Sequence, residues 1–412
     1  MLQKTLGDLG IGRRDFIVVF GLLVNSFTWL LFLRAFIEQA ISPSIIINQL
    51  PIWSAFYLSI IGFSIIGAVV SKRFSRRKFL QFWIVFGVMA SLLPVLFNNF
   101  TVINLAVVSA IFGASFGLGM PSCLALFTEI TKVDNRGRMG GITFLIVILV
   151  GPLLVAVSFE TLSLALLAPV WAVWRVTGLS VFFLKPRKKD SSEVIETSFV
   201  SILQDRPFLL YFVAWLMFSV VDIMEIPIVT QAVGGDESTL YGIMGIVEPI
   251  LSTVFILVAG VMCDWVGRKK IVLSGFVSLG AAYAIIGLFG KLAPDTVWYL
   301  YFVVDGAAWG IFYLTFTLVL WGDLSQSGSR EKYYALGSIP FFISYIIPHF
   351  VKLPSDDLTT AFSVAAFFLF LAVLPLISAP ETLPEKKMEL RRLRSFAEEA
   401  QKAKEKYERK VG

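Results

Sequence analysis

Four acidic residues of this 412-residue chain lie inside long apolar stretches: Asp222, Glu225, Glu248 and Asp305. A charged side chain deep in an apolar layer is costly, so such residues are usually paired or functional. Asp222 and Glu225 are three residues apart and therefore share one face of a helix, and Pro227 follows where it can kink that helix. Burial disfavours the charged form of a carboxyl group, so these acids suit proton binding or a cationic ligand.

The spacing along each stretch indicates how deep the acids lie. With a helical rise of ~1.5 Å per residue, Asp222 lies ~24 Å and Glu225 ~28 Å beyond Arg206. Asp305 lies ~12 Å from the far end of its own stretch, so it is expected near the level of Asp222. Glu248 is expected close to the middle of its stretch. For Glu225, an ordinary charge at a helix end is an equally consistent interpretation.

Two arginines also interrupt apolar stretches. Arg34 follows Arg14 by ~30 Å of helix, and its side chain is expected to extend to the outer interface. Arg175 lies deep in its stretch, where membership of a buried structural ion pair is the favoured interpretation. Aromatic residues of the acid-bearing stretches, such as Trp309, could stack on a sugar ring or face a cation.

These residues need membrane-spanning helices to hold them. The chain is 57% hydrophobic and 16% charged, with a mean hydropathy of +0.80, which excludes an ordinary soluble domain. A spanning helix needs about 20 mainly apolar residues. An all-α membrane protein with twelve transmembrane helices is therefore predicted, at residues 15–37, 45–70, 79–97, 102–127, 139–159, 162–184, 207–230, 240–262, 271–290, 297–321, 333–351 and 359–379.

The basic residues predict the orientation. All but four of the 35 Lys and Arg residues fall in the termini and in loops that would lie on one side. Positive residues are retained on the cytoplasmic side, so both termini of this multi-pass cell-membrane protein are expected to be cytoplasmic. The net charge of +6 then reflects topology and contact with lipid headgroups rather than nucleic-acid binding.

The chain repeats itself at a fixed offset. Four glycines recur 193 residues later: Gly67, Gly87, Gly113 and Gly117 reappear as Gly260, Gly280, Gly306 and Gly310. Such a repeat predicts two pseudo-symmetric six-helix bundles with a substrate site between them. The expected divisions are an N-terminal bundle at 1–184, a cytoplasmic linker at 185–206, a C-terminal bundle at 207–385 and an amphipathic cytoplasmic tail at 386–412.

One loop motif carries a family resemblance. The segment GVMCDWVGRKK at residues 260–270 resembles the signature G-x-x-x-D-x-x-G-R-K of the major facilitator superfamily. Gly260 permits close helix packing, Gly267 permits a tight turn, and Asp264 can accept amide hydrogen bonds or pair with a nearby arginine. Arg268, Lys269 and Lys270 are expected to anchor the loop at the inner surface. The resemblance implies that this motif latches the cytoplasmic gate.

Other segments follow or depart from the same family. The first-half copy of the motif, which starts at Gly67, has Ser71 in place of the aspartate. Two inner loops resemble those of the sugar and organic-ion porters of the family, at Glu129, Arg136 and Gly137, and at Asp323 and Arg330; Pro380-Glu381-Thr382 resembles the exit motif of that group. In the family the seventh and tenth helices line the central cavity, which implies that Asp222 and Asp305 share one pocket.

Residues and resemblance together predict a secondary active transporter that moves a small organic solute by alternating access, coupled to protons. A drug or cation efflux antiporter, and a sensor homologue that binds without transporting, remain alternatives. An enzyme is not expected, because a single histidine and the lack of a phosphate-binding loop leave no catalytic constellation. The expected partners are the solute, protons and lipid, for a monomer without cofactor or metal.

Overall fold

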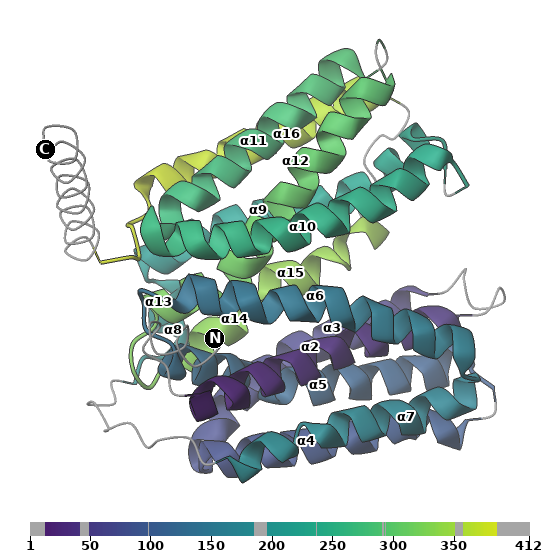
Figure 1. Cartoon of the computed structure of the whole chain (residues 1–412), viewed down its shortest axis with the longest axis vertical. Helices are drawn as coiled ribbons and strands as arrows, with labels where there is room; N and C mark the ends of the chain where they lie inside the picture. Colours follow the sequence, from purple (N-terminus) through teal and green to yellow (C-terminus); the bar gives the residue numbers. More distant parts are fainter. Residues whose placement is uncertain are drawn as a thin grey trace, which may run out of the picture.

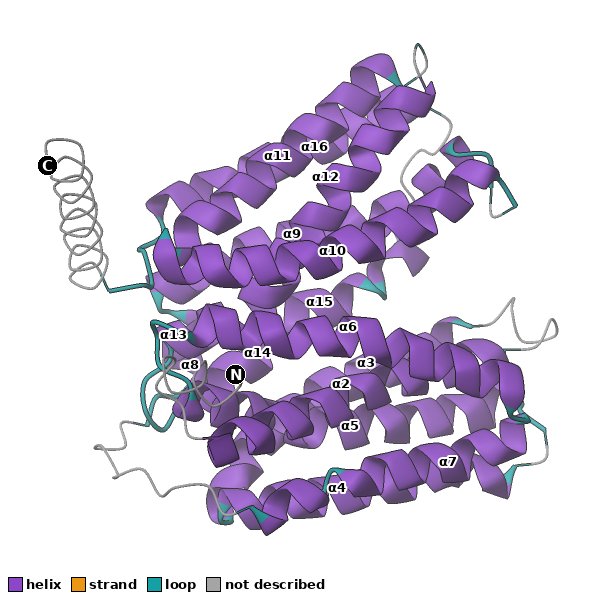
Figure 2. Ribbon diagram, in the orientation of Figure 1, coloured by secondary structure: helices purple, strands orange, loops and turns teal. Residues whose placement is uncertain are grey.

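The computed structural model describes residues 13–41, 49–97, 99–184, 196–235, 237–290, 292, 294–350 and 357–384. Helices dominate these ranges, and they contain no strand (Figure 2). The predicted tail at 386–412 and residues 185–195 of the predicted linker lie outside the described residues.

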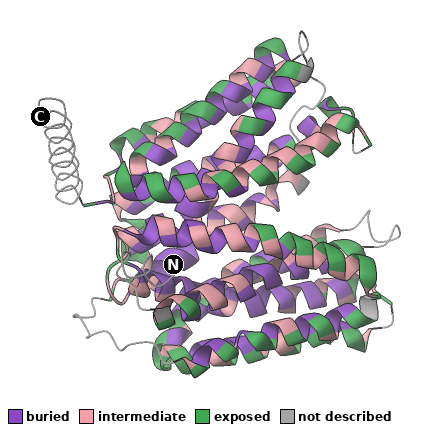
Figure 3. Ribbon diagram, viewed as in Figure 1, coloured by how far each residue is buried: buried purple, intermediate pink, exposed green. Residues whose placement is uncertain are grey.

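The first six long helices form one group, which Figure 1 shows in purple to teal. They are α2 (Arg13–Ala40), α3 (Leu50–Val70), α4 (Arg76–Leu92), α5 (Val102–Ile130), α6 (Arg136–Thr161) and α7 (Leu164–Thr177). These helices carry apolar residues on both faces. The residues on one face fill the interior of the group, and others, such as Ile103 and Leu153, are exposed on its outer face. Figure 3 shows this division between buried and exposed helix faces.

The second group follows the short helix α8 (Phe199–Leu203). It contains α9 (Arg206–Ala232), α10 (Thr239–Trp265), α11 (Arg268–Phe289), α12 (Pro294–Leu314), α13 (Leu320–Leu324), α14 (Arg330–Gly337), α15 (Ile339–Ser344) and α16 (Leu358–Ser378). A π-helical turn over Thr315–Val319 connects α12 directly to α13. Eleven helices of the described residues are long and apolar enough to cross a membrane.

The segment predicted as one helix at 333–351 is interrupted in the structure. It consists of α14, α15 and a 3-10 turn at Ile347–His349. Pro340 stands at the start of α15 and Pro348 lies within the 3-10 turn, and proline removes a backbone donor and clashes with the preceding turn of a helix. For this reason the described residues hold eleven long spans where twelve were predicted.

The repeated glycines pack in equivalent ways in the two groups. A Cβ on Gly113 of α5 would lie 2.1 Å from the carbonyl oxygen of Phe56 of α3, and one on Gly306 of α12 would lie 2.7 Å from that of Glu248 of α10. Because a side chain has no room at these positions, the helix pairs α3–α5 and α10–α12 approach closely. The repeat seen in the sequence therefore corresponds to the same helix contact made twice, and it places Glu248 where the first group has a phenylalanine.

The two groups meet along their length. The helix α6 packs against α10, while α14 and α15 pack against α3. The helix α2 begins and α16 ends at the left end of the molecule in Figure 1, together with the loops 71–75, 131–135, 266–267 and 325–329. We call this end, defined by those four loops, the latch end.

Candidate functional site

A cavity of about 370 Å³ lies between the two groups. The helices α2 and α6 line it from the first group, and α10, α12 and the segment after α14 line it from the second. Three acidic or basic side chains reach its wall: Arg34, Glu248 and Asp305. The predicted site between the halves therefore has a physical counterpart of the size that small-molecule sites commonly have.

Asp305 connects this cavity to a buried cluster of acids. One carboxylate oxygen each of Asp222, Glu225 and Asp305 lies within 4.8 Å of the others, and all three side chains are buried. The hydroxyl of Tyr301 donates a hydrogen bond to one oxygen of Glu225. The second oxygen of Glu225 and one oxygen of Asp305 have no hydrogen-bond partner among the described residues. Three carboxyl groups this close cannot all be negatively charged unless a cation lies among them. Without a cation, at least one of them holds a proton.

Glu248 faces the same cavity from α10. One of its carboxylate oxygens is buried and has no partner among the described residues. Pro249 follows it and also lines the cavity. The structure therefore brings all four acids of the apolar stretches to one region, although they come from three different helices.

Arg34 lies on the cavity wall, and its side chain is 44% exposed. Its Nε is 3.0 Å from a carboxylate oxygen of Glu38, one turn further along α2. Its guanidinium group lies 5.1 Å from the ring centre of Tyr345, whose hydroxyl accepts a hydrogen bond from Arg34 Nη1 at 3.4 Å. Arg34 is thus held by one acid of its own helix and one aromatic ring of the other group.

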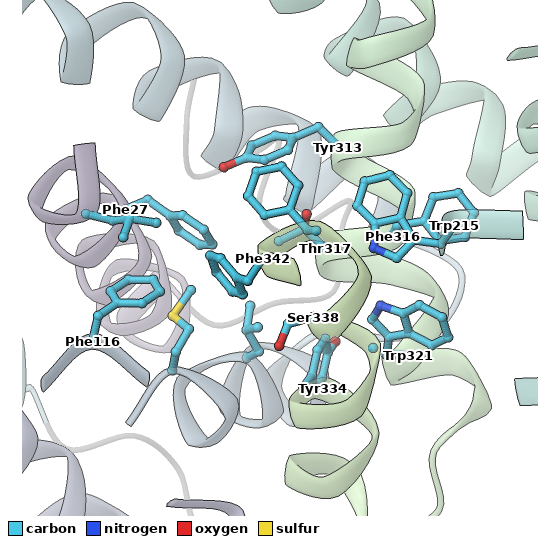
Figure 4. Close-up of a pocket in the computed structure, with 15 residues that line it drawn as sticks. Phe27, Phe116, Trp215, Tyr313, Phe316, Thr317, Trp321, Tyr334, Ser338 and Phe342 are labelled. Carbon is cyan, nitrogen blue, oxygen red and sulfur yellow. The ribbon is translucent and has the colours of Figure 1, made fainter. Parts of the chain in front are cut away.

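A second, smaller cavity of about 50 Å³ also lies between the groups (Figure 4). Phe27, Leu30, Tyr313 and Phe341 line both cavities, so these four side chains form the wall between them. The other lining residues of the smaller cavity include several aromatic side chains, among them Tyr334 of α14, which lies near the latch end. The two cavities therefore adjoin each other between the halves.

Asp264 links the two groups at the latch end. Its carboxylate accepts hydrogen bonds from the backbone amides of Gly137 and Arg138, each at 2.9 Å. These amides belong to the first turn of α6, where backbone donors lack partners within the helix. Arg268 Nη2 lies 3.2 Å from the same carboxylate, and so does Arg138 Nε. An acid of the second group therefore caps a helix of the first.

Asp323 is the centre of a second connection. Arg136 of the first group forms an ion pair with one of its oxygens, and Arg268 Nε lies 2.9 Å from the other. The side chains of Asp323 and Arg268 are fully buried. Breaking the contact between a buried carboxylate and its guanidinium partners is costly, because removal of either partner leaves an uncompensated buried charge.

The first group has a matching arrangement around Glu129. Arg76, the first residue of α4, forms an ion pair with Glu129, as Arg268, the first residue of α11, does with Asp323. Arg330 of the second group reaches Glu129 across the interface at 3.1 Å. The ion pairs within and between the groups thus follow the repeat of the sequence.

Further contacts complete the latch end. Arg76 also forms an ion pair with Glu331 of α14. Lys72 and Lys332 contact the carboxylate of Glu196 at 2.6 and 3.2 Å, and their hydrogen bonds hold the pKa of Glu196 below its usual range. The hydroxyls of Thr128 and Tyr334 lie 2.6 Å apart across the interface. Together these contacts join the two groups at the latch end in this conformation.

A sequence profile of the Major Facilitator Superfamily matches residues 16–347 of this chain. The chain belongs to this superfamily. The membership predicted from the loop motifs is confirmed, and with it the prediction of a membrane transporter. The eleven long apolar helices among the described residues fit a multi-pass membrane protein.

Two solved structures of the superfamily share the fold. The proton:xylose symporter XylE, solved with bound 6-bromo-6-deoxy-D-glucose, is similar with a TM-score of 0.64 at 14% identity, over 90% of this chain and 96% of XylE. The human organic anion transporter MFSD10 (TETRAN) is similar with a TM-score of 0.60 at 17% identity, over 88% of this chain and 99% of that protein. No curated protein matches this chain in sequence.

The remaining parts of the superfamily motifs have visible roles. Gly267 has a φ of 116°, a backbone conformation that glycine adopts without strain. A Cβ there would lie 2.3 Å from the carboxylate of Glu381, which accepts hydrogen bonds from the amides of Arg268 at 2.8 Å and Lys269 at 3.2 Å. The exit motif after the last helix thus caps the first turn of α11. In the degraded copy, the Ser71 hydroxyl is buried without a hydrogen-bond partner.

Sequence reasoning gave no role to several residues that form contacts at the latch end of this major facilitator, among them Arg76, Arg138 and Glu331. The signal for Arg76 was present, because it precedes Arg268 by 192 residues, close to the offset of the repeat. Arg138 and Glu331 gave no comparable signal, since each is one of many charges in a basic loop.

Arg175 corrects another prediction. Its guanidinium group lies 4.5 Å from the ring centre of Trp29 and 4.3 Å from that of Trp83. It donates hydrogen bonds to Asn25 Oδ1 at 2.7 Å and Ser26 Oγ at 2.9 Å, and no acid of the described residues forms an ion pair with it. The predicted buried ion pair is wrong: two aromatic faces and two neutral oxygens compensate this charge.

Proposed function

We propose that this chain is a secondary active transporter that moves a small organic solute across the cell membrane by alternating access, with protons as the coupling ion. One observation supports this most directly. The two groups are joined by contacts at the latch end, while Asp305 exposes a carboxylate of a buried acid cluster to the cavity between them. A site of this kind reaches the other side when the latch contacts break and the groups rock about it.

The topology follows from the same arrangement. The segment 330–349 would be an interrupted crossing, because about 20 residues of helix span ~30 Å. With the eleven long helices it makes twelve crossings in two six-helix bundles, and both termini then lie on the side of the latch end. The basic residues concentrated there support a cytoplasmic location for that side. The transporter would act as a monomer.

The coupling step would use the acid cluster. In the conformation with the latch closed, Asp305 takes up a proton from the cavity, and Asp222 and Glu225 share the remaining charge behind it. When the latch opens, the cavity faces the cytoplasm, and the proton leaves with the solute or in exchange for it. The protein contributes the position of the carboxyl groups and the exclusion of water from behind them.

The test is solute-dependent proton movement in proteoliposomes that contain a trapped pH dye. The purified chain is challenged with a panel of sugars, organic anions and organic cations, with and without an imposed pH gradient. The parent is expected to couple at least one solute to protons. Asp222→Asn and Asp305→Asn are expected to lose gradient-driven accumulation while exchange of the solute continues.

The matched control is Glu160→Gln, which neutralises an exposed acid of α6 and should behave like the parent. A parent that accumulates solute without any response to the pH gradient would remove the proton role. Binding of a solute without any flux would instead support the sensor alternative.

A further inference from the structure

We propose that the solute is a small organic cation, whose charged group binds between Glu248 and Asp305 and whose apolar body contacts the facing wall. This inference concerns the cavity of the proposed transporter and adds the chemical class of its ligand. It rests on charge, unsatisfied oxygens, aromatic lining and the asymmetry of the two halves.

The charges on the cavity wall do not balance. Of its three acidic or basic residues, Arg34 is paired with Glu38 at 3.0 Å, so its charge is already compensated. Glu248 and Asp305 have no cationic partner among the described residues, and Asp222 and Glu225 stand behind Asp305. The cavity therefore presents negative charge to a ligand, which attracts cations and repels anions.

Two of these carboxylates present unused acceptor atoms. One oxygen of Glu248 and one of Asp305 are buried without a hydrogen-bond partner, and only 3% of the surface of Asp305 is exposed. A buried acceptor without a donor is costly. A primary ammonium group has three donors and one positive charge, so it can donate hydrogen bonds to both carboxylates and offset one negative charge, whereas a neutral hydroxyl group has one donor and no charge.

Aromatic rings surround the same volume. Phe27, Trp309, Tyr313 and Phe341 line the cavity, and a cation within about 6 Å of such a ring centre is attracted to its face. The structure already shows one cation–π contact at the wall, because the guanidinium group of Arg34 lies over the ring of Tyr345. The other four rings are available to an organic cation.

The repeat shows that the acidic wall belongs to one half only. Phe56 stands in the first group where Glu248 stands in the second, since Gly113 and Gly306 pack on their respective carbonyl oxygens. The counterpart of Asp305 at the same offset is Phe112, which is fully buried. A ligand with one charged end and one apolar end matches this division, with its charge toward the second group and its body toward α2 and α6.

The volume distinguishes this ligand from a bare metal ion. A metal ion would need only the space within the 4.8 Å cluster of Asp222, Glu225 and Asp305, and it would leave Glu248 and the aromatic wall without a role. The cavity of about 370 Å³ accommodates an organic molecule.

The experiment measures binding by the purified full-length chain through its thermal unfolding and its tryptophan fluorescence. The probes are benzylamine and phenethylamine, which are primary ammonium ions at neutral pH and can donate N–H hydrogen bonds, the uncharged isostere benzyl alcohol, benzenesulfonate, D-xylose, NaCl and CaCl₂. We expect saturable stabilisation by the two organic cations, with at least roughly tenfold weaker binding of the uncharged isostere and of the sulfonate, because a charged partner is lost or reversed.

Variants locate the site. Glu248→Gln should weaken binding of the cations at least roughly tenfold, Glu248→Asp should restore part of it, and Glu160→Gln should leave it unchanged. Equal binding of the isostere or the sulfonate, undiminished cation binding by Glu248→Gln, or stabilisation by CaCl₂ or NaCl alone would each overturn the inference. Because the assay needs no flux, cation binding without transport would remove only the proposed function, and proton-coupled flux of a neutral or anionic solute without cation binding would remove only this inference.

Discussion

Gly137 of α6 and Gly260 of α10 lie backbone to backbone where the two groups meet. A Cβ on Gly260 would be 2.6 Å from the carbonyl oxygen of Gly137, and a Cβ on Gly137 would be 2.5 Å from that of Gly260. Asp264 reaches the amide of Gly137 one helical turn further on. The latch can therefore close only if both positions lack a side chain, and this requirement can be tested directly.

Gly260→Ala should prevent full closure of the latch. The obstacle is backbone, which cannot move aside as a side chain does, and overpacking of this kind costs about 1–3 kcal/mol. Maleimide labelling of Ser338→Cys, in the smaller cavity, should become several-fold faster in a chain whose Cys123 and Cys263 are replaced by serine. Gly242→Ala, on the same helix, is the control, since no atom outside the neighbouring helix backbone lies within 4 Å of its Cβ position. Equal labelling rates in both variants would contradict the role of Gly260.

Asp264→Asn should leave expression and membrane insertion intact but reduce transport. The side chain keeps its shape, yet it loses the charge that Arg268 and Arg138 share and accepts hydrogen bonds from the amides of α6 less strongly. Uptake at matched protein levels is the measurement. Ser71→Ala, at the corresponding position of the first half, should have a much weaker effect, because the Ser71 hydroxyl has no partner to lose.

Asp323→Asn should destabilise the closed conformation more than Glu129→Gln does. Asp323 is fully buried between Arg136 and Arg268, and breaking such a pair costs about 3–5 kcal/mol. The side chain of Glu129 is 35% exposed, and exposed pairs contribute about 0–1 kcal/mol. Thermal unfolding of both variants under one scan rate compares them, and equal shifts would show that burial does not set the strength of the latch.

Arg175→Lys should lower thermal stability without abolishing transport by the folded protein. A lysine keeps the charge but cannot stack on Trp29 and Trp83 together, and the loss of these contacts is expected to cost about 1–3 kcal/mol. Exposed Arg73 supplies the control Arg73→Lys, which should unfold at the temperature of the parent. Loss of transport at unchanged stability would instead assign Arg175 a functional role.

Reporter fusions test the topology. A reporter after Gly412 should give a cytoplasmic signal, and one inserted after Gly235 should give an external signal, because positive residues hold the latch end inside. A cytoplasmic signal at both positions would exclude the interrupted segment 330–349 as a crossing. External signals at both positions would likewise exclude that crossing, and an external signal after Gly412 together with a cytoplasmic signal after Gly235 would overturn the orientation.

The sequence by itself determined the features that depend on local composition or on the repeat. The length of the apolar segments predicted eleven of the membrane-spanning helices. The loop signature at 260–270 predicted the family. The fixed offset predicted equivalent packing, which Gly113 and Gly306 show on α3 and α10. These features are readable because each depends on residues close together in the chain or related by one constant separation.

Only the tertiary structure decided which distant residues meet. Asp222 and Asp305 are 83 positions apart, and their proximity depends on the rotation of α9 and α12 about their axes, which an evenly apolar helix does not encode. The capping of Gly137 by Asp264 requires the docking of two groups, and the position of Arg175 between two tryptophans requires three packed helices. Side-chain charge is visible in a sequence, but its compensation depends on distance and burial, which arise only when the helices pack.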